Sequence, residues 1–187
     1  CQQYYYLTDS FVPRFEFSCK RNTHTVLFDL YDESYTMDLE DFNNACKIPQ
    51  WGIRSEPHKT DYNDFLASII MGETRNITQA TIGRIHFPTI HYFSFFIGRC
   101  INGKHDHSHL CASDLSVLKC AVMGDKQYNL GAIIARRLHN NAIDGDFFGG
   151  IYETHLANYL GVPIRENDIE LPLLSLTIML WYTTSFL

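Results

Sequence analysis

The sequence predicts a mainly α protein, built as a single helical domain with one small N-terminal β-hairpin. Its 187 residues are enough for one ordinary domain with its own core, and few for two. Apolar residues alternate on both sides of residues 32–34, which is the pattern of a half-buried hairpin. Beyond residue 39 they recur three and four positions apart, which is the pattern of amphipathic helices.

The hairpin is expected over residues 25–39, and a short helix follows it directly. Asp38 is placed to cap that helix, because its carboxylate can accept a bond from an amide of the first turn. Glu40 and Asp41 complement the positive end of the helix dipole. Pro49 then ends the helix, since proline removes a backbone donor and clashes with the preceding turn.

The rest of the chain is expected to be helical. The stretch 88–103 begins with Pro88 in the first turn and is apolar nearly all round, so we predict that it forms the central buried helix. A helix over 113–124 would take Ser113 or Asp114 as its N-cap and end at Gly124. Thr78 is the expected N-cap of one further short helix, and the remaining helices are predicted over 62–72, 128–141 and 149–161.

This pattern predicts which side chains form the core. Twelve apolar residues lie on the expected inner faces of the hairpin and the helices. They are Phe28, Leu30, Phe42, Phe65, Ile69, Phe93, Phe96, Leu118, Ile133, Leu138, Leu156 and Leu160.

Composition limits the function classes. The formal net charge is −6, which argues against a dedicated binder of nucleic-acid backbones, because such proteins carry a clustered basic face. No secretory signal opens the chain, and no two of its six cysteines form a Cys-x-x-Cys pair. We therefore expect reduced thiols and a cytoplasmic or nuclear protein. The cysteines are Cys1, Cys19, Cys46, Cys100, Cys111 and Cys120.

The stretch from Cys100 to Cys111 has the highest density of metal-ligand residue types. On a strand, His105, His107 and His109 would share one face. Closed zinc sites, however, combine closely spaced ligand pairs, and this spacing does not match them. Gly, Asp and Ser between the histidines suit a polar loop, so we predict no metal here.

The other candidate residues also point away from catalysis. His86, His91 and His155 lie among apolar residues, as histidines at the edge of a core do. The glycine-rich stretch 145–150 lacks the Lys-Ser/Thr pair of a phosphate loop. Arg136 and Arg137 are expected on a solvated helix face. We predict no catalytic, cofactor-binding or metal-binding residue, no cofactor, no small-molecule substrate and no enzymatic activity.

Four stretches together resemble the first-open-reading-frame protein of plant Athila-like, gypsy-type LTR retrotransposons, and the resemblance runs from about residue 25 to about residue 172. They are "LYDESYTMDLEDFNNACKIPQWG", "FLASIIMGETRNITQATIGRIHFPTIHYFSFFIGRCINGKHDHSHLC", "DLSVLKCAVMGDKQYNLGAIIARRLHNN" and "GDFFGGIYETHLANYLGVPIRENDIELP". The opening "FDLYDESYTMDLEDFNNACKIP" is also similar, more loosely, to plant transposon and plant mobile domains.

The resemblance implies a non-enzymatic, retrotransposon-derived protein with a gag-like structural or assembly role. Its partners would be further copies of the chain and, weakly, element RNA. The alternative is a module like the plant mobile domain, which would bind protein or chromatin partners. Light scattering at increasing concentration and RNA binding would separate the two.

The ends of the chain depart from this family. Because the sequence begins at Cys1, we expect a truncated N-terminal segment over 1–24, before the retrotransposon-derived domain of 25–172. Residues 173–187 form a divergent apolar tail, which we expect to contribute little to the fold. Residues 171–187 are too short and too rich in Ser and Thr for a spanning helix, so no membrane association is predicted.

Overall fold

The computed structural model describes residues 3–20, 23–55, 63–72, 80–101, 108–124, 127–144 and 152–171. They divide into two compact units. The sheet unit comprises the described residues of Cys1–Ile48 and Asn141–Leu187, and the helical unit comprises those of Pro49–Asn140. The divergent tail 173–187 and the glycine-rich stretch 145–150 lie outside the described residues.

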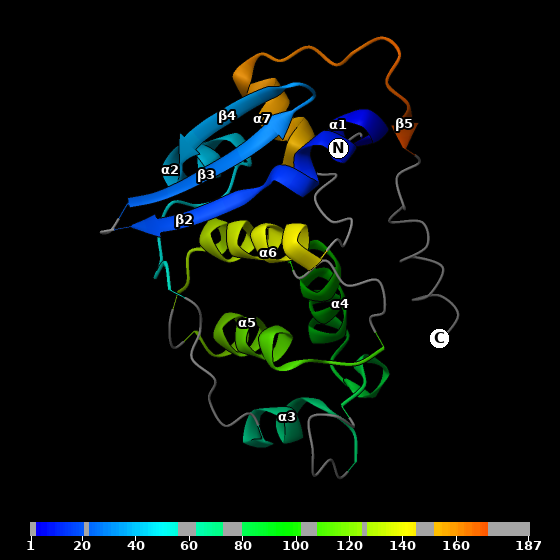
Figure 1. The fold of residues 1–187 in the computed structure, drawn as a ribbon. Helices are drawn as coiled ribbons and strands as arrows, with labels where there is room; N and C mark the ends of the chain where they lie inside the picture. The colour runs from blue at the N-terminus through cyan, green and yellow to red at the C-terminus, as the bar shows by residue number, and fades with distance from the viewer. Residues whose placement is uncertain are drawn as a thin grey trace. The chain divides into compact units, whose positions relative to one another are not determined.

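Three antiparallel strands form the centre of the sheet unit, in the order β2 (Glu16–Lys20), β3 (Thr23–Leu30) and β4 (Glu33–Asp38) (Figure 1). Glu16 lies opposite Leu27, and Lys20 lies opposite Thr23. On the other side of β3, Leu30 lies opposite Glu33. The two-residue turn between β3 and β4 fixes this second register, because side chains alternate between the two faces of a sheet.

Helices cover the inner face of this sheet. α1 (Tyr5–Phe11) contacts β3, α2 (Leu39–Ala45) contacts β3 and β4, and α7 (Tyr152–Leu160) contacts both of these helices. The short 3-10 helix η1 (Val12–Arg14) joins α1 to β2. Next to α1, β1 (Gln3–Tyr4) pairs with β5 (Glu170–Leu171). Segments from both ends of the chain therefore build one core.

Aromatic rings fill that core. Phe28 of β3 is fully buried, with its ring centroid 5.5 Å from that of Phe11 and 6.2 Å from that of Phe15. Phe42 of α2 is also fully buried, 6.2 Å from Phe15. Each large ring removes much apolar area from water, and aromatic pairs at these distances add a favourable contact beyond that burial. Two of the four rings come from the segment before residue 24.

These observations correct the predicted fold class. Within the described residues the chain has seven α-helices and a three-stranded antiparallel sheet, so it is a mixed α/β protein and not a mainly α protein with one hairpin. The predicted hairpin is present as β3 and β4. The third strand, β2, comes from the N-terminal segment, where only Phe17 and Cys19 carry the period-two pattern.

The helical unit contains four α-helices in its described residues. They are α3 (Asn63–Ile69), α4 (Pro88–Phe96), α5 (Ala112–Met123) and most of α6 (Leu130–Asp144). A 3-10 helix, η3 (Ile82–Arg84), precedes α4, and a π-helical turn, η4 (Ile97–Ile101), continues it. Asn129 begins α6, because its Oδ1 accepts a hydrogen bond from the amide of Ala132 at 2.9 Å.

The central buried helix was predicted wrongly. Within α4 itself only Ser94 is buried, while Tyr92 is 50% and Phe96 38% exposed. The apolar side chains that do become buried, Ile97 and Ile101, belong to the following π-helical turn. Apolar composition alone does not bury a helix, since folded proteins keep much apolar surface in contact with water.

Of the two further predicted N-caps, the one for α5 is wrong and the one at Thr78 is not tested. The N-cap of α5 is Cys111, and Asp114 lies in the first turn, where its carboxylate accepts the Cys111 amide at 2.8 Å. Thr78, predicted to cap a helix, lies outside the described residues. The predicted end at Gly124 is correct, because this residue adopts the left-handed conformation with φ of 68°.

Most of the predicted core is confirmed. Nine of the twelve residues are buried: Phe28, Leu30, Phe42, Phe65, Ile69, Leu118, Ile133, Leu138 and Leu156. Phe93 and Leu160 are half-buried, and Phe96 is exposed. Among the described residues, no helix is long and apolar enough to cross a membrane.

Candidate interaction surface

The outer face of the sheet is open and is lined mainly by hydroxyl-bearing and charged residues. Side chains that alternate with the buried Val26, Phe28 and Met37 point away from the core and line a shallow hollow of about 410 Å³. These side chains, which we call the outer face, are Glu16, Ser18, Lys20, Thr23, Thr25, Leu27 and Thr36. Leu27 is their one large apolar member and is 37% exposed. Hydroxyls and two opposite charges around an apolar centre suit contact with another polypeptide better than tight enclosure of a small molecule.

Among the strands that the structure describes, the sheet ends on β2 at one side and on β4 at the other. Strands at the ends of a sheet turn alternate amide and carbonyl groups away from their neighbour, so such strands can accept a further strand. In β2, Glu16, Cys19 and Lys20 are exposed. The outer face and the β2 edge thus form one continuous candidate surface in the sheet unit.

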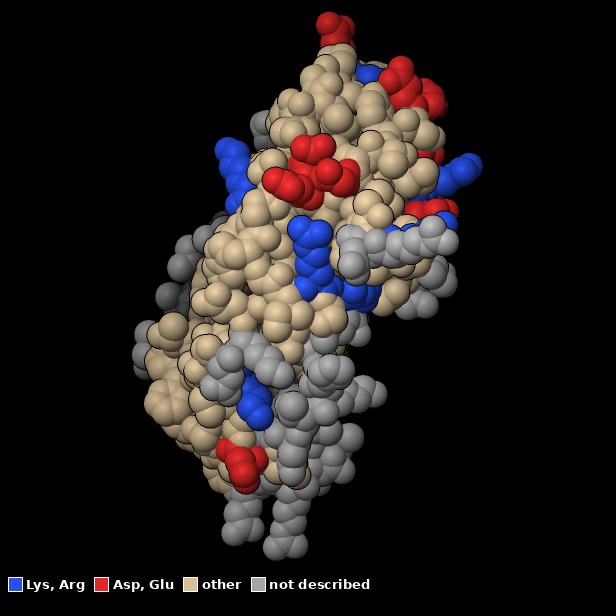
Figure 2. Space-filling view, turned by 90° about the vertical axis from the view of Figure 1, so that its left-hand side faces the viewer, with Lys and Arg blue, Asp and Glu red and all other residues tan. Residues whose placement is uncertain are grey.

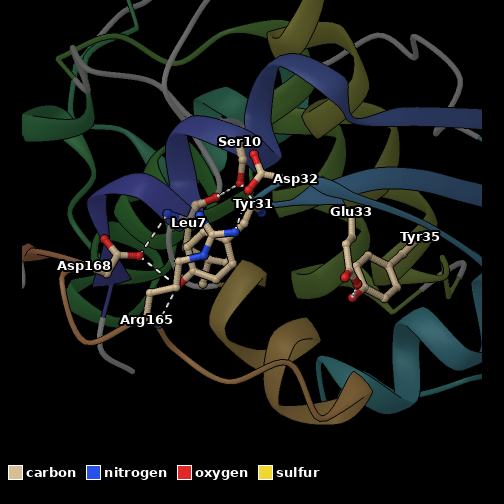
Figure 3. Close-up of polar contacts among 8 residues, drawn as sticks. All are labelled: Leu7, Ser10, Tyr31, Asp32, Glu33, Tyr35, Arg165 and Asp168. Atoms are coloured by element: carbon tan, nitrogen blue, oxygen red, sulfur yellow. Dashed lines mark hydrogen bonds and ion pairs between the residues drawn. The ribbon is translucent and has the colours of Figure 1, made fainter.

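A cluster around Tyr31 ties the β3–β4 turn to the segment before β5 (Figure 3). The Tyr31 hydroxyl donates to Asp168 at 2.9 Å and accepts from the Arg165 amide at 3.2 Å. The Arg165 guanidinium lies 4.2 Å above the centre of the Tyr31 ring and 2.6 Å from the Asp32 carboxylate. Burial, more than any other cause, raises the pKa of Tyr31, so the hydroxyl keeps its proton.

The same cluster extends to α1. Asp168 accepts the amide of Tyr6 at 2.9 Å. It also accepts the amide of Leu7 at 3.2 Å, and the Ser10 hydroxyl accepts the Tyr31 amide at 2.7 Å (Figure 3). Tyr31 has a φ of 56°, a left-handed conformation that costs a bulky residue about 1–2 kcal/mol. The hydrogen bonds hold Tyr31 in that conformation, so we assign this cluster to structure.

Glu153 of α7 is a buried acid whose hydrogen bonds indicate its protonation state. The Thr8 hydroxyl lies 2.8 Å from the Tyr4 carbonyl oxygen and 2.6 Å from Glu153 Oε1. A hydroxyl has one hydrogen, and a carbonyl can only accept. When Thr8 donates to Tyr4, the second bond needs a proton from Glu153.

Burial agrees with this assignment, because it raises the pKa of Glu153 to about 8. Oε2 is also buried and makes no hydrogen bond to a described residue, as suits a neutral carboxyl better than a charged one. Glu153 is fully enclosed and anchors α1 to α7.

The residues singled out in the sequence are scattered in the structure. His105 and His107 lie outside the described residues, His109 is exposed beside the Ser108 hydroxyl at 2.7 Å, and Cys111 caps α5. Among the residues that the structure describes, no group of three or more His, Cys, Asp or Glu side chains is placed to hold a metal ion.

The remaining candidates have local structural roles. Burial lowers the pKa of His91 and of His155, so both rings favour the neutral form. The centroid of the His86 ring lies 4.0 Å from that of the Phe87 ring. Arg136 and Arg137 are half-buried and not fully solvated, and Arg136 donates to the Arg54 carbonyl oxygen at 3.3 Å.

Cys46 is a poor nucleophile. Burial raises the pKa of its thiol to about 12, and the thiolate is the reactive form of cysteine. Of the residues singled out in the sequence, Cys19 lies on β2, but none lines the outer face. Sequence reasoning missed this surface because β2 was not recognised as a strand.

Comparison with known proteins gives no assignment. No family model, no curated protein and no solved structure matches the chain.

Proposed function

We propose that this chain is a non-enzymatic, retrotransposon-derived protein that acts by self-association, in a gag-like structural or assembly role. The observation that carries the proposal is the three-stranded sheet, which ends on β2 within the described part of the chain and has an open outer face. A sheet that can accept a further strand is a common means of joining polypeptides. The resemblance to Athila-like first-open-reading-frame proteins supports the same class.

Direct RNA contact is a weaker part of the proposal. Clustered Lys and Arg supply most of the non-specific affinity for nucleic acid, through release of counterions. The net charge here is −6. On the face drawn in Figure 2, the Lys and Arg side chains of the described residues form small separate groups near Asp and Glu. We therefore expect RNA binding that is weak and confined to low salt.

The cysteines support a reducing compartment. Cys19, Cys46 and Cys111 are free thiols in the described structure. Free thiols are usual in the cytoplasm and nucleus, where disulfides are rare. We propose one of these two locations.

A second candidate function is an interaction module for protein or chromatin partners. The helical unit favours it, because Trp51 is 59%, Met71 64% and Tyr92 50% exposed. Aromatic and Met side chains are enriched in the cores of protein interfaces. Such a module would bind a different protein and would not need to self-associate.

Light scattering at increasing concentration, run beside a salt-titrated RNA-binding assay, tests the choice between them. The gag-like proposal expects an average mass that rises with concentration, and RNA affinity only at low salt. A strict monomer at high concentration with no RNA affinity at low salt would reject it and favour the interaction module.

A further inference from the structure

We propose that β2 pairs antiparallel with β2 of a second copy of the chain, about a two-fold axis at Ser18, to form a continuous six-stranded sheet. This inference rests on the proposed function, because it names the surface through which the chain self-associates. A two-fold axis uses the same patch on both copies, so one strand must be complementary to itself.

The position of β2 makes such pairing feasible. β2 is a terminal strand of the sheet, hydrogen-bonded to β3 along residues 16–20. Its charged side chains, Glu16 and Lys20, are exposed. Neither forms an ion pair or side-chain hydrogen bond with a described residue.

The order of residues in β2 supplies the self-complementarity. The strand reads Glu-Phe-Ser-Cys-Lys, with one acid and one base at equal distances from Ser18. In an antiparallel pair centred on Ser18, Glu16 therefore lies opposite Lys20 of the second copy, and Lys20 lies opposite its Glu16. Directly opposite side chains of unlike charge stabilise an antiparallel pair, and like charges destabilise it.

The faces of the two sheets also match. Glu16, Ser18 and Lys20 all belong to the outer face. Opposite residues of an antiparallel pair share one face. The two outer faces would therefore join into one surface, and the two ion pairs would lie on it in contact with water.

The association should be weak and sensitive to salt. β2 has five residues, and a stable protein interface buries roughly 1,600 Å² in total, more than one such strand supplies. Dissolved salt screens exposed charges, with a Debye length of about 10 Å at 0.1 M that shortens as salt is added. We expect reversible dimers at high protein concentration that dissociate further as salt is added.

Charge reversal and exchange on the full chain test this pairing by light scattering. Lys20→Glu and Glu16→Lys each place like charges opposite one another and should lower the association constant about tenfold. The double variant Glu16→Lys with Lys20→Glu exchanges the two charges and should restore association to within about threefold of the original. Asp9→Lys in α1 makes the same charge change at an exposed side chain outside the sheet and should leave association unchanged.

Each outcome decides the proposal. Loss in both single variants and recovery in the double variant supports pairing through β2, provided that the variants keep the circular dichroism and thermal transition of the original chain. If the original chain associates and the single variants associate equally well, another surface is used, and this inference is wrong while the proposed function stands. A strictly monomeric original chain would reject this inference, and if it also shows no RNA affinity at low salt it would reject the proposed function.

Discussion

The two terminal strands of the sheet flank the same central strand but differ in charge and in attachment. β2 carries one acid and one base, Glu16 and Lys20, so its charges cancel and complement those of a second β2. β4 carries two acids, Glu33 and Asp38, and no base. A second copy of β4 would meet like charge, which opposes pairing.

The two terminal strands also differ in how they are joined to the neighbouring helices. β4 continues directly into α2, and Asp38 both ends the strand and caps the helix, accepting the Asp41 amide at 2.8 Å. β2 is reached from α1 through η1, and α1 is held by the hydrogen bond between Thr8 and Glu153. Like charge therefore opposes self-pairing of β4, whereas the unlike charges of β2 match those of a second β2.

The largest expected loss of stability comes from a substitution in β3, the strand that lies between β2 and β4. Phe28→Ala should lower the free energy of unfolding by about 3–5 kcal/mol, because Phe28 is fully buried between aromatic rings and its removal leaves a cavity. Chemical denaturation measures the change. Leu27→Ala, on the outer face, is the control and should cost less than about 1 kcal/mol, since Leu27 is 37% exposed. Equal losses in the two variants would contradict the assignment of the inner and outer faces.

A pH dependence is expected at Glu153, which is hydrogen-bonded to Thr8 of α1, the helix that leads through η1 into β2. Its pKa rises from 4.5 in the unfolded chain to about 8 in the folded protein. Between these values the folded protein keeps a proton that the unfolded chain has lost. The stabilising contribution is therefore complete below about pH 4.5, and it is lost as the pH rises to about 8. The slope is at most about 1.4 kcal/mol per pH unit.

Glu153→Gln isolates this contribution from that of the other carboxylates. The Gln amide can donate to the Thr8 hydroxyl as a protonated carboxyl does, but it does not titrate. Denaturation curves at several pH values between 5 and 8 should show the variant gaining stability over the original chain as the pH rises. Parallel pH profiles would mean that Glu153 is not held protonated.

A smaller effect is expected on the β4 side. Asp38→Ala removes the cap of α2 and should lower the free energy of unfolding by about 1 kcal/mol, with no change in self-association. Asp38→Asn should retain most of the stability, because the amide oxygen can accept the same backbone bond. A loss of association in the Ala variant would show that the two edges are not independent.

The sequence predicted the parts of the sheet unit in which local signals agree. Apolar alternation around the turn predicted β3 and β4, and Asp38 followed by two acids predicted the start of α2. Each signal is contained within a few residues and does not depend on distant contacts. The core residues of these elements, Phe28 and Phe42 among them, were predicted on the same basis.

The open edge and the Glu153 anchor could not be predicted in this way. β2 has only Phe17 and Cys19 on its inner face, and neither is fully buried, so its alternation is weak. Thr8 and Glu153 are separated by 145 positions, and only the folded chain brings them together. The exposure of Phe96 was missed because the outcome depends on which helices pack around α4.

Disulfide formation through Ser18 measures the contact between two β2 strands most directly. In an antiparallel pair about Ser18 the two Ser18 Cα atoms would lie about 4.5–5.5 Å apart, a separation that a disulfide spans. Ser18→Cys in a Cys19→Ser background should therefore give a covalent dimer under mild oxidation. Ser34→Cys in the same background, on β4, should give no more dimer than the background alone. Equal yields from the two strands, or none from Ser18→Cys at concentrations where the chain associates, would contradict pairing through β2.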